Sequence, residues 1–191
     1  MKSEHILAEI DKIIAAQGDI KRAEKTEVNA AKSTSVKKEG MLQSDSQTSG
    51  SPLPLTDAQT STLQGICDLL DREVEVFNWT GFYLASATEE RMLELGPFTG
   101  EPTDHSRIPY GTGICGQAAE TLDTFVVQDV SKAENYLACS VTVKSEIVVP
   151  IMKNGTFLGE LDIDSHTKDA ITPELQELCE EICRRLAAEV F

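Results

Sequence analysis

The sequence contains no long hydrophobic run, no zinc-binding cysteine pattern and no internal repeat. None of its apolar stretches approaches the ~18 residues that a membrane-spanning helix needs. The first residues, Met1 to Leu7, do not form an apolar run followed by a small-residue cleavage site, so we find no secretory signal. These absences favour a cytoplasmic protein with no membrane partner.

Basic residues are scarce in the larger, C-terminal part of the chain. The net charge is −15, and residues 1–55 add nothing to it because they hold 8 basic and 8 acidic side chains. Residues 56–191 hold 9 basic and 24 acidic side chains. Because phosphate backbones and anionic lipids are bound through Lys and Arg, we expect neither nucleic acid nor membrane as a partner.

Composition divides the chain into three parts. Residues 1–17 carry isoleucines at helical spacing and predict an amphipathic N-terminal helix. Residues 18–54 are rich in Lys, Glu, Ser, Thr and Gln, almost without large apolar side chains, and predict a flexible polar linker. Residues 55–191 then predict one folded domain.

The sequence of that domain predicts a helix at each end and short strands between them. Thr56 and Gln59 form a capping-box pattern, and Thr172 followed by Pro173 starts the last helix. We expect loop at 96–98, an irregular edge at 101–107, a short helix at 117–121, and strands at 77–85, 91–95, 125–127, 147–151 and 156–163. Hairpin strands between terminal helices indicate an α+β fold with an antiparallel sheet.

The five cysteines fall into two groups. Cys67, Cys179 and Cys183 lie on or beside apolar helical stripes, where a small core residue is the expected use. Cys115 sits in a Gly-rich turn, and Cys139 sits in an irregular segment seven residues before the carboxylate Glu146, which opens an apolar strand. Neither setting requires a thiol for packing, so these two are the candidate reactive cysteines.

Two further acids lie on the last predicted strand. Asp162 and Asp164 alternate with Leu161 and Ile163, so both carboxylates share one face, opposite the apolar pair. Crowding raises the pKa of one carboxyl, which suits acid-assisted chemistry; the alternative is a solvated strand end. With His166 the pair could also chelate a metal, but no further ligand has an obvious spacing, and we expect no metal.

Trp79 and Tyr83 share a face of the first predicted strand. The same spacing suits an aromatic wall of a pocket or ordinary core packing, and the sequence does not separate the two.

Six motifs occur in a specific order: Phe77–Tyr83, Leu95–Phe98, Gly113–Gly116, Ala138–Cys139, Ser145–Pro150 and Leu161–Ser165. As a set they closely resemble the free methionine-(R)-sulfoxide reductases, which are built on a GAF domain. The resemblance covers residues 56–191. It implies a six-stranded antiparallel GAF sheet flanked by N- and C-terminal helices, and often a homodimer.

The resemblance also implies roles at matching positions. Cys139 would attack the sulfoxide sulfur, and Cys115 would resolve the resulting sulfenic acid as a disulfide. Glu146, Asp162 and Asp164 would hold the substrate ammonium group and assist the departing oxygen. Trp79 and Tyr83 would enclose the methyl end.

The implied enzyme is an oxidoreductase acting on free methionine sulfoxide, with no bound cofactor and with thioredoxin as its reductant. The family commonly has another cysteine before the Gly-rich turn, where this chain has Thr103-Asp104-His105. It also has an acid after the nucleophile, where this chain has Ser140. The alternatives are a non-catalytic GAF sensor of a small or redox-active ligand and a metal-binding module.

Overall fold

The computed structural model describes residues 3–16, 54–133 and 142–191. It contains an N-terminal helix at 3–16 and three further helices, α2 (Asp57–Glu73), α3 (Gly113–Thr121) and α4 (Pro173–Glu189). A short 3-10 helix, η1, covers Val130–Lys132. The strands are β1 (Trp79–Ala85), β2 (Met92–Thr99), β3 (Arg107–Pro109), β4 (Phe125–Val127), β5 (Ser145–Lys153) and β6 (Thr156–Ser165).

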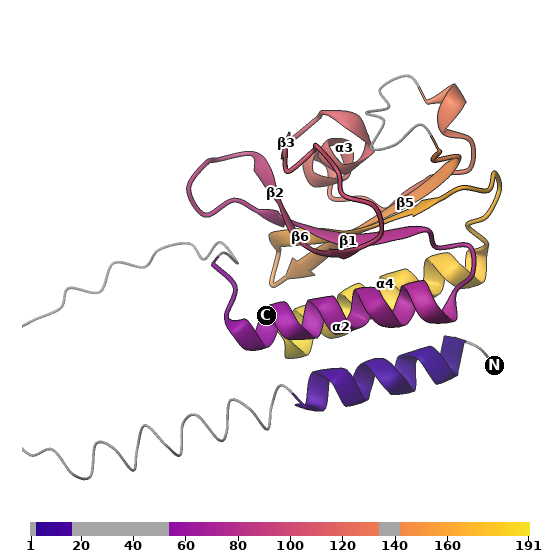
Figure 1. Cartoon of the computed structure of the whole chain (residues 1–191). Helices are drawn as coiled ribbons and strands as arrows, with labels where there is room; N and C mark the ends of the chain where they lie inside the picture. Colours follow the sequence, from indigo (N-terminus) through magenta and orange to yellow (C-terminus); the bar gives the residue numbers. More distant parts are fainter. Residues whose placement is uncertain (1–2, 17–53, 134–141) are drawn as a thin grey trace, which may run out of the picture.

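The strands form one antiparallel sheet of six, in the order β3-β2-β1-β6-β5-β4. Helices α2 and α4 lie side by side against one face, and α3 lies on the other (Figure 1). The predicted α+β fold, with its six-stranded antiparallel sheet and flanking helices, is confirmed. In the described part of the chain, none of the helices has the length and apolarity needed to cross a bilayer.

The two long helices begin where their capping residues predict. The Thr56 hydroxyl accepts a hydrogen bond from the Gln59 backbone, and the Gln59 side chain accepts one from the Thr56 backbone. The Thr172 hydroxyl accepts from the Leu175 backbone, with Pro173 at the first helical position. These bonds satisfy N–H groups that the first helical turn leaves without partners.

The main core lies between α2, α4 and the sheet. It contains the inward side chains of β5 and β6, namely Ile147, Val149, Ile151, Leu161 and Ile163. Cys67, Cys179 and Cys183 belong to the same core, as their apolar stripes indicate. Burial raises the pKa of Cys179 to about 12, so this thiol stays protonated at neutral pH.

The N-terminal helix packs against α2 and α4 as an outer layer (Figure 1). Ile6, Ile10 and Ile14 on its inner face are buried in the main core. Ile13 lies over Gly65 of α2, where a Cβ would make an ordinary contact at 3.4 Å from the isoleucine side chain. The boundaries of the three parts remain predictions, because the linker proposed for 18–54 lies outside the described residues except for Pro54.

Four of the five predicted strands have at least one end that differs from the prediction by one to four residues, and three segments differ in kind. The segment expected as loop at 96–98 belongs to β2, where Phe98 pairs with Gly81 across a register shift that accommodates Pro97. The irregular edge expected at 101–107 leads into a short strand, β3, that starts at Arg107. Helix α3 begins at Gly113 rather than at 117, so Cys115 lies inside it.

Candidate active site

Strand alternation directs one set of acidic side chains away from the main core. Leu161 and Ile163 of β6 enter that core, while Asp162 and Asp164 point to the opposite face. Strand pairing aligns them with neighbours on both sides: Asp164 lies between Glu146 of β5 and Trp79 of β1. Three carboxyl groups therefore converge on the face that α3 covers.

Aromatic rings lie beside these acids. The Trp79 and Phe98 rings are stacked with centroids 5.6 Å apart, and Tyr83 follows at 6.4 Å from Trp79. The Trp79 ring lies over Gly81, where a Cβ would be only 2.3 Å from a ring carbon. Gly81 pairs with Asp162 of β6, and the absence of a side chain at this position makes room for the tryptophan ring.

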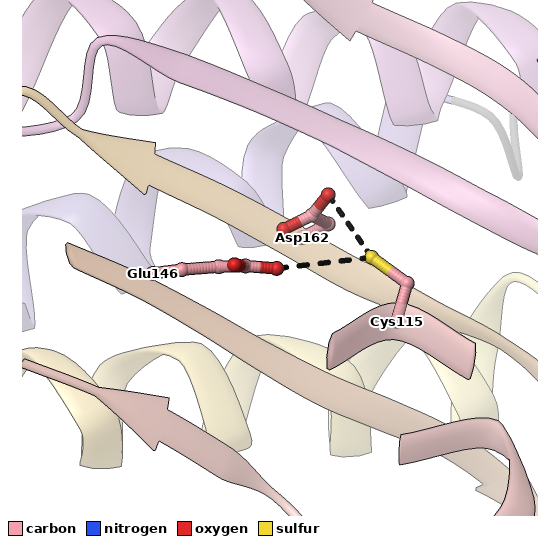
Figure 2. A group of neighbouring side chains, drawn as sticks. All are labelled: Cys115, Glu146 and Asp162. Atoms are coloured by element: carbon pink, nitrogen blue, oxygen red, sulfur yellow. Dashed lines mark hydrogen bonds between the residues drawn. The ribbon is translucent and has the colours of Figure 1, made fainter. Parts of the chain in front are cut away.

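Helix α3 brings Cys115 to the acids. Gly116 allows the close packing, because a Cβ there would be 2.5 Å from the carbonyl oxygen of Pro109. The Cys115 Sγ lies 3.3 Å from Asp162 Oδ2 and 3.9 Å from Glu146 Oε1. Figure 2 shows the three side chains pointing toward one another from α3, β5 and β6. In this geometry the thiol donates to a carboxylate.

The buried acids hold protons more tightly than ordinary carboxyls. Burial, and then the charges of Asp162 and Asp164, raise the pKa of Glu146 well above its usual value. Burial raises the pKa of Asp162 to about 7, and burial together with Asp162 raises that of Asp164. A set of this kind contains protonated and ionised members near neutral pH, so it can donate a proton and bind a cation.

A cavity of about 140 Å³ opens next to these acids. Trp79 and Asp164 line one side of it, and residues from 101–103 and 142–143 line the rest together with Asn78 and His166. The Trp79 indole donates to the carbonyl of Glu101 at 3.0 Å, which fixes the ring at the cavity edge. The cavity therefore combines an aromatic wall with a buried carboxyl.

Six of the seven predicted site residues lie in the described part of the chain, and the seventh, Cys139, lies outside it. Cys115, Glu146 and Asp162 are brought together, and Asp164 adjoins them from the same face. Trp79 lines the cavity, whereas Tyr83 is fully buried and its hydroxyl donates to the carbonyl of His105 at 2.8 Å.

The proposed metal set of Asp162, Asp164 and His166 is not assembled. The aspartates point inward, whereas His166 is exposed and its ring lies 3.0 Å from the Thr142 hydroxyl. Within the described ranges, the one group of three ligand-type side chains close enough to share an ion is Cys115, Glu146 and Asp162.

Glu160 is a fourth buried acid that the sequence analysis missed. It is fully buried, and neither of its carboxyl oxygens has a hydrogen-bond partner among the described residues. Burial and the charge of Asp162 raise its pKa well above the usual value. The signal was present in the sequence, because Glu160 continues the alternation of Asp162 and Asp164 along β6.

The GAF domain family model matches residues 56–190. A free methionine-R-sulfoxide reductase of Saccharomyces cerevisiae is 50% identical over 88 residues, which are 46% of this chain and 48% of the yeast protein. The Escherichia coli enzyme of the same name is 34% identical over 126 residues, 66% of this chain and 74% of that protein. The chain belongs to the GAF-domain family of free methionine-R-sulfoxide reductases.

A solved structure supports this placement in the family. The free methionine-R-sulfoxide reductase of Neisseria meningitidis, in complex with its substrate, has a TM-score of 0.65 and 33% identity, over 69% of this chain and 77% of that one. The chain spans about half the length of the yeast relative. The named relatives favour the reductase over the sensor alternative.

Proposed function

We propose that the protein reduces free methionine-(R)-sulfoxide to methionine through a cysteine thiol–disulfide cycle. The observation that carries this proposal is the buried contact of Cys115 with Asp162 and Glu146 beside an aromatic-lined cavity. Family membership supplies the reaction class, and the chemistry of these side chains agrees with it.

Cys139 is the proposed nucleophile. Its thiolate attacks the sulfoxide sulfur, and the sulfoxide oxygen is transferred to the cysteine sulfur with uptake of one proton. The sulfoxide sulfur gains two electrons and becomes a thioether, while Cys139 loses two and becomes a sulfenic acid. The proton makes the oxygen a better leaving group, so a protonated acid must lie near it.

Glu146, Asp162 and Asp164 are the proposed sources of that proton and the proposed binding group for substrate. With its pKa raised to about 7, Asp162 can hold a proton at neutral pH and release it during the reaction. Asp164 lines the cavity and is the proposed partner of the substrate ammonium group, because a bound cation favours the ionised form of this carboxyl against its raised pKa. Trp79, with Tyr83 behind it, would contact the methyl end.

Cys115 is the proposed resolving residue. Its thiolate attacks the sulfur of the Cys139 sulfenic acid, an S–S bond forms as the S–O bond breaks, and the hydroxyl takes up one proton and leaves as water. This step requires the two Cα atoms to come within about 5–6 Å. A dithiol reductant of the thioredoxin class would then reopen the disulfide, so no bound cofactor is needed. A reducing cytoplasm suits this cycle, and a homodimer is the proposed assembly.

The test is a coupled NADPH–thioredoxin assay with each epimer of free methionine sulfoxide. We expect turnover of the R epimer, little of the S epimer, and none by Cys139→Ser. Cys67→Ala, on the other side of the sheet, is the control and should retain turnover. Absence of R-epimer turnover, or full activity of Cys139→Ser, would contradict the proposal and favour a ligand sensor.

A further inference from the structure

The face of the sheet under α3 holds an excess of buried negative groups. Four carboxyl side chains are buried there, Glu146, Glu160, Asp162 and Asp164. The described residues include no buried Lys, Arg or His. Buried carboxylates are costly unless they are protonated or paired with a cation. On this face the carboxyl groups are therefore either protonated or neutralised by a cation that the described part of the chain does not supply.

Glu146, Asp162 and Asp164 each have one carboxyl oxygen that is buried without a hydrogen-bond partner among the described residues. These oxygens are Glu146 Oε2, Asp162 Oδ1 and Asp164 Oδ1. Each belongs to a side chain that is at most 2% exposed. These oxygens are independent of the contacts that Asp162 Oδ2 and Glu146 Oε1 make with Cys115.

The geometry of the three closest groups fits a tetrahedral metal ion. Ligand atoms of Cys115, Glu146 and Asp162 all lie within 4.8 Å of one another. A tetrahedral Zn²⁺ with bonds of about 2.3 Å to sulfur and 2.0 Å to oxygen places these atoms roughly 3.5 Å apart. The Sγ–O separations of 3.3 Å and 3.9 Å lie on either side of that value (Figure 2).

We propose that the reduced protein binds one thiophilic divalent cation of the Zn²⁺ class through Cys115, Glu146 and Asp162. Binding replaces the thiol proton by the metal and releases that proton, with no change of oxidation state. A thiolate ligand favours Zn²⁺, Co²⁺ or Cd²⁺ over Mg²⁺ and Ca²⁺, which prefer oxygen alone. Three protein ligands leave a fourth position for water.

This site also restrains the reaction, a consequence that rests on the proposed function. The metal occupies the carboxyls proposed for the substrate and ties up the resolving thiol, so metal and methionine sulfoxide compete. The substrate ammonium is a cation as well, but it does not need the Cys115 sulfur. Dependence on that sulfur therefore separates a metal site from an ammonium site.

The experiment titrates the reduced full chain with Co²⁺ alone, without substrate, and follows the absorption spectrum. We expect one equivalent to bind, with a thiolate-to-cobalt charge-transfer band and the strong visible bands of tetrahedral Co²⁺. Cys115→Ser should remove the charge-transfer band. Asp162→Asn should keep the band but weaken binding at least ten-fold, since the thiolate remains while one anionic ligand is lost.

Two control variants identify the sulfur. Cys179→Ala removes a thiol from the opposite face of the sheet and should leave the titration unchanged. Cys139→Ser should also retain the charge-transfer band. Absence of stoichiometric binding, a band that survives Cys115→Ser, or a band that requires Cys139 instead would overturn the proposal.

The titration separates this proposal from the enzymatic one, because it is read without turnover. Cobalt binding in a protein that does not reduce methionine sulfoxide would reject the proposed reaction and uphold the metal site. Turnover in a protein that binds no cobalt would uphold the reaction and reject the metal site.

Discussion

Replacing Glu160 by glutamine is expected to stabilise the protein at neutral pH. Glu160 lies on β6, fully buried, with both carboxyl oxygens lacking a partner among the described residues. Burial, followed by the charge of Asp162, raises its pKa in the folded state well above the ordinary glutamate value. At neutral pH the Glu160 carboxyl is ionised in the unfolded chain. In the folded protein it must either bind a proton or remain as a buried charge without a partner among the described residues.

The sign and size follow from proton linkage. Between the ordinary glutamate pKa and the raised one, the unfolded state binds one proton fewer than the folded state. The contribution of Glu160 to the free energy of unfolding therefore falls by about 1.4 kcal/mol for each unit of rising pH in that window. Glutamine does not titrate, so Glu160→Gln gains about 1.4 kcal/mol relative to the wild type for each of those units.

The assay is urea unfolding of the reduced protein at several pH values from about 5 to about 7, where the wild-type slope is expected. Glu177→Gln on the exposed side of α4 is the matched control, and its free energy of unfolding should change with pH as that of the wild type does. If the free energy of unfolding of Glu160→Gln depended on pH with the same slope as that of the wild type, Glu160 would carry no raised pKa. The account of this buried acidic face would then be wrong.

Three further predictions concern the aromatic wall, the acids and the N-terminal helix. Gly81→Ala should lower the free energy of unfolding in urea by about 1–3 kcal/mol and shift the fluorescence of Trp79, the one tryptophan, because the new Cβ would overlap its ring. Gly65→Ala is the control and should do neither, because its Cβ would lie 3.4 Å from the nearest side-chain atom. Asp164→Asn should raise the KM for methionine-(R)-sulfoxide about 10- to 100-fold through loss of a charge-assisted contact, and an unchanged KM would exclude Asp164 from substrate binding. Ile10→Ala should lower the free energy of unfolding by about 2–4 kcal/mol, and a cost near zero would mean that the N-terminal helix is not part of the cooperative fold.

Local sequence rules predicted the parts of the fold that depend on local physics. The alternation at Leu161–Asp164 predicted which side chains enter the main core, and the structure agrees. The Thr56 and Thr172 caps predicted where two helices begin, because a cap is satisfied by residues within one turn.

The errors arose where distant segments decide the local structure. Pro97 suggested a loop, but β2 continues through it because Phe98 finds Gly81 of β1 as its partner. Gly116 suggested a turn, yet it lies in a helix, where the absence of a side chain lets α3 pack on the Pro109 carbonyl. Whether a strand can include a proline, or a helix a glycine, depends here on a neighbouring segment that the local sequence does not specify.

The candidate site was predictable in part. Alternation along β6 pointed to Asp162 and Asp164, and the same alternation applied to Glu160. Glu146 was predicted from its place after Cys139 at the start of an apolar strand. The contact between Cys115 and these acids was not predictable from spacing, since it depends on how α3 is docked across the sheet.

The most direct test of the central claim is disulfide mapping after a single turnover. Reduced protein is mixed with one equivalent of methionine-(R)-sulfoxide without thioredoxin, remaining thiols are alkylated, and peptides are identified by mass spectrometry. The account predicts one methionine per chain and a peptide pair linked through Cys115 and Cys139. Methionine formation that leaves Cys115 fully alkylated would contradict it.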